Sequence, residues 1–292
     1  MKSLKPCSIA LFSLGIFLVM STPTLSAQTH EATFVHQLPA NLEGGGDFSQ
    51  TRTRFQTSGQ LFRSPSLMAN WSLSVGSAHY NFSSKASSPW RDIYHGGINL
   101  ALIHPFDRQW SLLVSPGISA AGEADADAGD SLSYGLVAAL NWQASETLRL
   151  GIGGGAFQNL EELEGFPLII IDWQLAEAWR LANPLRAGVT GPAGLELSWT
   201  PDNKWTIGTG GAWRSFRFRL DDDAPNPEGV GEDQITPVWV RMSRKLPVGQ
   251  MSLYLGALLA GELSVENRHG DRVGRQNYDD TPFGALYFTG SF

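Results

Sequence analysis

Apolar residues alternate with small or polar residues, with a period of two, along most of this chain. From Leu132 to Trp142 and from Met251 to Val265, every second position is apolar or nearly so. Successive side chains on a β-strand point to opposite faces, so this period is typical of strands with one apolar face. The longest apolar stretch after the N-terminal region, Phe166 to Ile171, is far shorter than a membrane-spanning helix requires. The pattern predicts an all-β protein.

The composition favours a membrane-spanning barrel among all-β folds. With 17% charged residues, 32 glycines and 10 tryptophans, the chain is too polar for a helical membrane protein. A barrel strand needs only about 9 to 11 residues, of which every second one faces lipid. Glycines such as Gly151, Gly153 and Gly155 alternate along one face, which suits strands that curve around a lumen.

The N-terminus has the features of a secretory signal peptide. Lys2 and Lys5 precede an apolar run from Ser8 to Met20, and a small, polar stretch follows up to Ala27. We expect cleavage after Ala27; an uncleaved anchor helix is the alternative. The only cysteine, Cys7, would leave with the signal, and the formal charge would change from -7 to -9. The mature chain would then have no thiol for a disulfide, a metal or catalysis.

The C-terminus has the features of a final barrel strand. Leu286, Phe288 and Phe292 share one face, and the sequence stops on the aromatic residue. This ending resembles the signal that the outer-membrane barrel assembly machinery recognises, so we expect that machinery and the outer-membrane lipids with lipopolysaccharide as partners. A soluble periplasmic β-sandwich is the alternative that alternation alone would leave open.

A turn pattern repeats three times and places tryptophans at strand ends. In Trp142 to Leu148, Trp173 to Trp179 and Trp199 to Trp205, five residues separate an aromatic residue from the apolar residue that opens the next strand. Indole prefers the headgroup level of a bilayer, so we interpret these positions as an interface girdle; cross-strand packing in a soluble protein is the alternative. The predicted girdle comprises Trp110, Trp142, Trp173, Trp179, Trp199 and Trp205.

Placing the short turns on the periplasmic side predicts an antiparallel up-and-down transmembrane β-barrel of 12 to 14 strands with longer acidic outer loops. The cleaved signal would be residues 1–27, residues 28–46 an N-terminal segment, and residues 47–292 the barrel. Thirteen strands can be assigned, an odd number, so either a strand around 32–39 is added or one hairpin is wrong. The thirteen lie near residues 47–57, 67–81, 92–103, 110–121, 131–143, 148–157, 167–175, 179–187, 193–200, 204–219, 235–244, 251–264 and 281–292.

The predicted outer loops are acidic. The loops at 122–130, 158–166 and 220–234 contain many carboxylates and no lysine or arginine up to Asp233. We interpret them first as solvated loops, with binding of divalent cations or of lipopolysaccharide phosphates through cations as the sharper hypothesis. Asp125, Asp127 and Asp130 are weak metal candidates, because they alternate near a glycine but lack the later bidentate glutamate of a calcium loop.

Charged residues are also predicted inside the lumen. Arg214, Arg217 and Arg241 could set anion selectivity, or they could pair with Glu196 and Glu262 and fill the barrel. Pairing is the expected arrangement, because unpaired charge is costly where a lumen is narrow. The aromatic residues of the 204–219 segment change parity between Trp213 and Phe216, which suggests a bulge.

No enzyme motif is found. His36, His79, His95, His104 and His269 stand in none of the arrangements of serine, histidine and acid that outer-membrane hydrolases or acyltransferases need, and no histidine spacing matches a metal site. We therefore expect no catalytic residue, no cofactor and no nucleic-acid partner.

The segment from Gly191 to Glu262 resembles a bacterial family of outer-membrane β-barrels that is catalogued as a domain of unknown function. The features that carry the resemblance include the Gly191 to Trp199 stretch, the Phe216 to Asp223 stretch and Pro237-Val-Trp239. The resemblance implies a fold and a location but brings no catalytic residues. Three functions stay open: a passive channel or transporter for small solutes, a structural or surface-binding barrel with a closed lumen, and an outer-membrane enzyme, which the sequence favours least.

Overall fold

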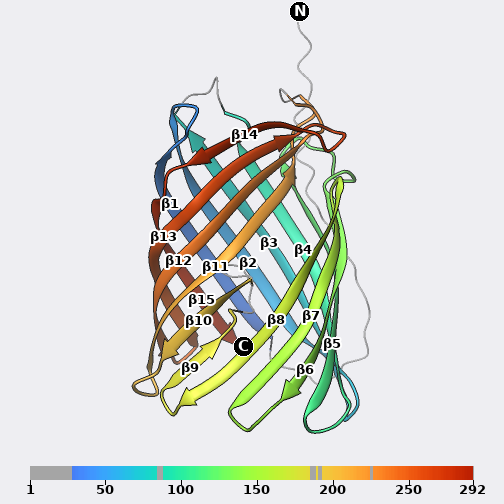
Figure 1. The fold of residues 1–292 in the computed structure, drawn as a ribbon, viewed down its shortest axis with the longest axis vertical. Coiled ribbons are helices and arrows are strands. Elements are labelled where there is room, and N and C mark those ends of the chain that lie inside the picture. Colours follow the sequence, from blue (N-terminus) through green and yellow to red (C-terminus); the bar gives the residue numbers. More distant parts are fainter. Residues whose placement is uncertain (1–27, 84–87, 185–188, 190–192, 224–225, 292) are drawn as a thin grey trace, which may run out of the picture.

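The chain forms a closed, antiparallel β-barrel without helices among the residues that are described (Figure 1). The structure, a computed structural model, describes residues 28–83, 88–184, 189, 193–223 and 226–291. None of these residues belongs to a helix long and apolar enough to cross a membrane. The strands are β1 (Thr29–Asn41), β2 (Asp47–Arg63), β3 (Met68–Phe82), β4 (Asp92–Pro105), β5 (Trp110–Glu123), β6 (Leu132–Gln143), β7 (Leu148–Asn159), β8 (Glu162–Ala176), β9 (Trp179–Ala182), β10 (Ala193–Trp199), β11 (Trp205–Arg219), β12 (Val230–Leu246), β13 (Gly249–Glu266), β14 (Arg272–Tyr278) and β15 (Thr281–Ser291).

Fourteen strands make up the barrel wall, because β14 and β15 are successive parts of one strand. β13 pairs with β14 over residues 261–266 and with β15 over residues 250–258, and β15 pairs in turn with β1. The pairing of β12 with β13 completes the ring. The prediction of an all-β barrel is confirmed, and the strand missing from the count of thirteen is β1, which contains the segment 32–39.

The short turns at one end of the barrel are closed by side-chain hydrogen bonds. We call this the short-turn end; the other end is the long-loop end. The Asp107 carboxylate accepts the backbone N–H groups of Gln109 and Trp110, both at 2.7 Å. Asp202 does the same for Lys204 and Trp205, at 2.7 and 2.8 Å. In both turns, an aspartate three residues before a tryptophan stabilises the turn through these local hydrogen bonds.

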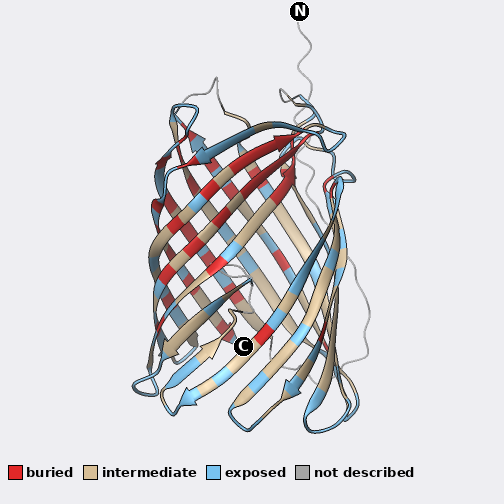
Figure 2. Ribbon diagram, in the orientation of Figure 1, coloured by how far each residue is buried: buried red, intermediate tan, exposed pale blue. Residues whose placement is uncertain are grey.

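The wall is apolar outside and more polar inside, as a transmembrane barrel requires. On β1, Phe34 is 45% exposed, whereas its neighbour Thr33 and the following Gln37 are buried. Phe34 lies opposite Leu286 of β15, which is 49% exposed. Phe288 has the same parity as Leu286, so the two residues share the outward face, as predicted. Figure 2 shows that buried residues gather toward the long-loop end of β11 to β13.

The strand pairing of the wall is reduced at β9 and β10, which are short. β8 pairs with β9 only through residues 172–176, and β10 pairs with β11 only up to Trp213. The last part of β11, residues 214–219, is paired with β12, and no described residue of β10 pairs with it. We call residues 214–219 the β11 tip.

Three expectations about the strands and their connections are wrong. The predicted outer loop 220–234 is shorter, because β12 begins at Val230 and contains the buried Glu232 and Asp233. Residues 158–166 do not form a long loop, because β7 and β8 continue to a turn at Leu160 and Glu161, where Leu160 has a positive φ of 58°. The β11 strand carries no bulge, since its register with β12 is the same before and after the change of aromatic parity; the irregularity lies instead between β12 and β13, near Gln234. The predicted signal, residues 1–27, and Phe292 lie outside the described residues.

Candidate functional site

The β11 tip crosses the lumen at the long-loop end. Arg219 forms a parallel bridge with Gly122 of β5, although several strands separate β11 from β5 around the wall. The Arg219 guanidinium donates hydrogen bonds to the backbone carbonyl of Asp130 and, at 2.7 Å, to the Glu161 carboxylate. The tip is thus held to the opposite side of the barrel.

One face of the β11 tip packs into a cluster of aromatic rings. Phe218 lies 4.9 Å from Trp90 and 6.3 Å from Tyr80, measured between ring centroids. Phe48 and Phe82 stack on each other at 5.3 Å and continue the cluster across β2 and β3. All five side chains are buried. We call them the aromatic cluster; they fill this side of the lumen.

A buried carboxylate, that of Asp233, lies beside the aromatic cluster and accepts hydrogen bonds from its neighbours. Asp233 of β12 has no exposed surface, and it accepts hydrogen bonds from the hydroxyls of Tyr80 (3.0 Å) and Tyr278 (2.9 Å). Gln50 donates a third bond, at 3.3 Å. Arg214 Nη2 lies 3.6 Å from Asp233 Oδ2, beyond a normal hydrogen bond. Asp233 therefore accepts three hydrogen bonds from neutral side chains, and Arg214 forms an ion pair with it without a hydrogen bond.

The opposite face of the β11 tip holds a network of ion pairs. Arg217 donates two hydrogen bonds to Glu266 and lies 3.5 Å from Glu232. It also lies 3.5 and 3.6 Å from Glu162 and Glu164, which belong to β8. At this height β8 pairs with β7, but no described residue of β9 pairs with its other edge, and the ion pairs connect that part of β8 to the β11 tip.

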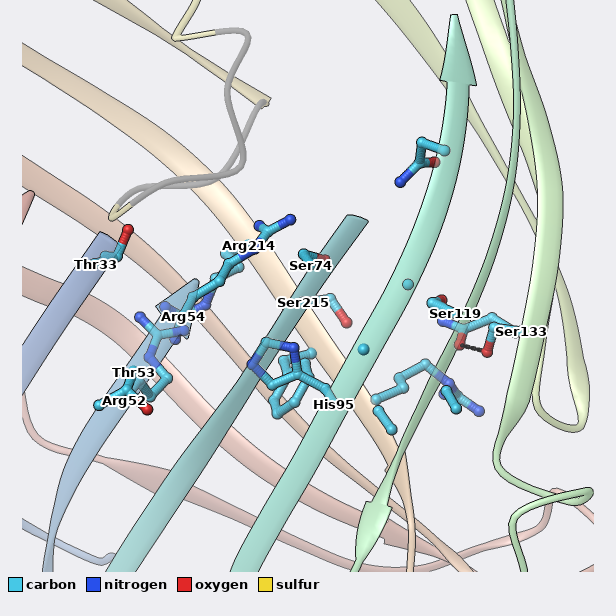
Figure 3. Close-up of a pocket in the computed structure, with 18 of the residues that line it drawn as sticks. Thr33, Arg52, Thr53, Arg54, Ser74, His95, Ser119, Ser133, Arg214 and Ser215 are labelled. Carbon is cyan, nitrogen blue, oxygen red and sulfur yellow. Dashed lines mark hydrogen bonds between the residues drawn. The ribbon is translucent and has the colours of Figure 1, made fainter. Parts of the chain in front are cut away.

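A polar cavity of about 370 Å³ lies in the lumen beside the β11 tip (Figure 3). Arg54 of β2, His95 of β4 and Arg214 of β11 project into it from different parts of the wall, together with Arg52. None of the described residues that line it is acidic. The remaining polar lining consists of Thr33, Thr53, Ser74, Asn99, Ser119, Ser133, Asn159, Ser215 and Arg217.

Glycine makes room for the larger side chains of this cavity. A Cβ on Gly76 would lie 2.6 Å from His95 Nε2, so the imidazole occupies the space that a side chain on β3 would fill. Gly76 pairs directly with His95 in the sheet, which fixes this arrangement. The alternation of glycine with other residues thus lets polar groups lie flat against the inner wall.

Ion pairs also line the lumen nearer the short-turn end. Arg241 Nη2 lies 2.6 Å from Glu196 Oε1, and Trp239 donates its indole N–H to the same carboxylate at 2.9 Å. Asp172 accepts hydrogen bonds from Arg149 at 2.9 Å and from Arg180 at 2.7 Å.

The predicted lumen charges are thus divided among three places. Arg241 and Glu196 pair inside the barrel, as the pairing alternative expects. Arg214 and Arg217 both line the cavity, and Arg217 also takes part in the network of ion pairs. Glu262 pairs instead with Arg275 of β14, at 2.6 Å, away from the cavity. Sequence reasoning missed Arg52 and Arg54, although their spacing of two on a strand places both on one face.

The six predicted girdle tryptophans lie on the outward face near the short-turn end. Trp110 stacks on Trp142 with centroids 5.8 Å apart, and Trp179 stacks on Trp199 at 6.1 Å. Trp173 and Trp205 occupy equivalent positions, and Arg244 lies 5.2 Å from the Trp205 ring. Their role at a membrane interface stays a prediction.

The weak metal candidates form a turn. Asp127 Oδ1 accepts the backbone N–H groups of Gly129, at 2.7 Å, and Asp130, at 3.3 Å. Across the described ranges, no three side chains of histidine, cysteine, aspartate or glutamate gather in a way that could hold a metal ion. Cation binding by Asp125, Asp127 and Asp130 remains a prediction without support from this geometry.

Comparisons with known proteins identify a family and a solved structure of similar fold. A family model described as a domain of unknown function (DUF6268) matches residues 50–209, earlier in the chain than the stretch where the sequence resemblance is sharpest. No curated protein matches the sequence. The COG4313 outer membrane channel from Pseudomonas putida F1 has a similar structure, with 14% identity, a TM-score of 0.51, and coverage of 93% of this chain and 97% of that one. A FadL homologue from Pseudomonas aeruginosa is similar at 10% identity and a TM-score of 0.47, over 91% of this chain and 90% of that one.

Proposed function

This chain belongs to the family described as a domain of unknown function (DUF6268), and we propose that it is a passive channel or transporter for small solutes in the bacterial outer membrane. One observation carries the proposal: the barrel encloses a polar cavity of about 370 Å³ within its lumen. Packed protein interiors contain few voids larger than a water molecule. A cavity of this size, lined by charged and hydroxyl groups, supports the binding or passage of a solute.

The proposed location follows from the outer surface and from the fold. The outward face is apolar, and tryptophans lie on it near the short-turn end, on strands between β5 and β11. A fold shared with an outer-membrane channel supports the same compartment. In this orientation the short turns lie in the periplasm and the β11 tip lies toward the cell exterior. Export by a cleaved signal, contact with lipopolysaccharide and insertion by the barrel assembly machinery belong to this proposal.

Passage requires the β11 tip to move. The aromatic cluster fills the lumen on one face of the tip, and the Arg217 ion pairs occupy the other face. A solute that enters from the long-loop end must displace one of these two contacts. We therefore expect a channel that is closed at rest and opens infrequently.

The aromatic cluster also favours a second candidate, a structural or surface-binding barrel with a permanently closed lumen. Five buried rings form a packed plug that a freely open pore would not contain. An outer-membrane enzyme is the third possibility. His269 lies in an exposed turn and His95 faces the cavity. If the protein is an enzyme, replacing one of these histidines should abolish its activity. That the protein is not an enzyme remains a prediction.

Reconstitution of the purified native chain in planar lipid bilayers tests the proposal. We expect discrete current steps that scale with the number of inserted molecules, and swelling of liposomes that contain the protein when small solutes are added outside. A correctly inserted barrel with neither current nor swelling would favour the closed-lumen candidate. Heat-modifiable gel mobility confirms that each preparation is folded.

A further inference from the structure

We propose that the lumen cavity is a binding site for a small oxyanion, a carboxylate or a phosphate. The inference rests on the proposed function, because it names the class of solute for the same cavity. It differs from the general expectation of lumen charges, since it depends on Arg214 and Arg52 and not on the ion pairs elsewhere in the barrel.

The charges that line the cavity are predominantly positive. Four arginines supply these charges, and none of the described lining residues carries a carboxylate. Arg217 is already neutralised by Glu266, with which it shares two hydrogen bonds. Arg214 has one carboxylate nearby, that of Asp233 at 3.6 Å, and makes no hydrogen bond with it.

Arg214 has donors to spare. Its side chain is only 11% exposed, and none of its three guanidinium nitrogens makes a hydrogen bond with a described residue. Asp233, its nearest carboxylate at 3.6 Å, already accepts bonds from Tyr80, Tyr278 and Gln50. A buried guanidinium without hydrogen-bond partners is costly. An oxyanion in the cavity would satisfy it, because the planar fork of arginine matches two oxygens of a carboxylate or phosphate.

Arg52 supplies a second incomplete donor to the same cavity. Its Nε is buried and has no hydrogen-bond partner among the described residues. Arg52 and Arg214 come from β2 and β11, so the two donors belong to distant parts of the barrel and converge only in the lumen. Convergence from separate strands distinguishes a binding site from a row of arginines that merely follows one strand.

The size and the neutral lining define the ligand further. A volume of about 370 Å³ is near the lower end of small-molecule pockets, which span roughly 300 to 1,000 Å³. Ser74 and Ser119 add hydroxyls to the lining, whereas Val35 and Phe216 provide apolar contact. The cavity therefore suits a small anion with room for a short organic part.

Calorimetric titration of the purified native protein with sodium benzoate and with inorganic phosphate tests the proposal. Benzyl alcohol and benzylamine serve as neutral and cationic probes of similar size. We expect at least one of the two anions to bind and neither matched probe to do so; which anion binds identifies whether the source is a carboxylate or a phosphate. If neither anion binds, or if all four probes bind equally, the proposal is overturned.

The Arg214→Gln variant locates the site. Loss of charge-assisted hydrogen bonds should weaken anion binding roughly 10- to 100-fold. Arg244→Gln is the matched control, because Arg244 lies outside the lumen beside Trp205. Equal affinities in the native protein and in Arg214→Gln would contradict the assignment. Should Arg214→Gln not fold, Arg52→Gln replaces it, with the same weakening expected and unchanged affinity counting against the site.

Failure of this inference can be told apart from failure of the proposed function. Anion binding without any bilayer current would leave the binding site intact in a barrel that does not conduct. Equal conductance for benzylamine and for benzoate, with no measurable binding of either anion, would support the channel and overturn the anion site.

Discussion

Arg217 donates two parallel hydrogen bonds to Glu266, from Nη1 to Oε1 at 3.2 Å and from Nη2 to Oε2 at 2.8 Å. The side chains of Arg217, Glu232 and Glu266 are 2, 5 and 8% exposed, so the pair lies in a region from which water is largely excluded. This geometry joins β11 to β13 and, through Glu162 and Glu164, to the edge of β8.

Replacement of Arg217 by methionine should destabilise the barrel strongly. The variant keeps a long side chain but leaves two buried carboxylates without their cation, which costs about 3 to 5 kcal/mol in comparable buried pairs. Arg275→Met is the control: its pair with Glu262 is 57% exposed on the arginine side and should contribute about 0 to 1 kcal/mol. Urea unfolding in detergent measures both. Equal losses in the two variants would show that the Arg217 network does not hold the tip.

Gly231→Ala should disturb the aromatic cluster. A Cβ at Gly231 would lie 2.7 Å from Phe218 Cζ and 3.0 Å from Trp90 Cε3, so both rings would have to move. Overpacking of this kind costs about 1 to 3 kcal/mol. In Gly211→Ala, the matched control on β11, the nearest side-chain atom would lie at an ordinary 3.5 Å. Near-ultraviolet circular dichroism reports on the rings; an unchanged spectrum in Gly231→Ala alongside unchanged stability would refute the packing described for the cluster.

The outward tryptophans should report the depth of the bilayer. In a variant that retains Trp199 as its only tryptophan, fluorescence should be quenched more by lipids brominated near the headgroup than by lipids brominated at the chain ends. A variant that retains only Trp239 should show little quenching by either lipid, because that side chain is 3% exposed and hydrogen-bonded to Glu196 inside the lumen. Similar quenching of both would argue against the girdle.

The strands could be predicted because their signals are local. Alternation identifies each strand, and Asp107 and Asp202 fix two of the short turns through bonds to residues two and three positions away. The odd count of thirteen predicted either a further strand around 32–39 or one wrong hairpin, and the structure has the further strand, as part of β1. None of these features depends on contacts between distant parts of the chain.

The β11 tip could not be predicted in the same way. Its alternation is that of an ordinary wall strand, and only the contacts of Phe218 with Trp90 and of Arg219 with Gly122, far apart in sequence, show that it crosses the lumen. Glu161, Glu162 and Glu164 have no basic neighbours in sequence, so they are predicted to be a solvated loop. Their ion-pair partners are Arg217 and Arg219 of β11, which are distant in sequence. In the structure β8 begins at Glu162, directly after the turn at Leu160 and Glu161.

The candidate site was predicted in part. The pairing of Arg241 with Glu196 follows from strand parity and the cost of unpaired charge. The cavity could not be predicted from the sequence, because Arg52 and Arg54 belong to β2 whereas Arg214 belongs to β11, and only the folded barrel brings them together. Glu262 was expected in the lumen, but it pairs with Arg275 of β14, which is paired with this part of β13.

The current through single molecules with and without the aromatic cluster tests most directly whether the β11 tip closes a channel. In the Trp90→Ala/Phe218→Ala variant, removal of two rings from the cluster should give longer openings and larger conductance than in the native protein. Trp110→Ala/Trp142→Ala removes a stacked pair from the outer surface and should leave the current unchanged. If the native protein and the Trp90→Ala/Phe218→Ala variant are both folded and both fail to conduct, the lumen is not a passage and the account is contradicted.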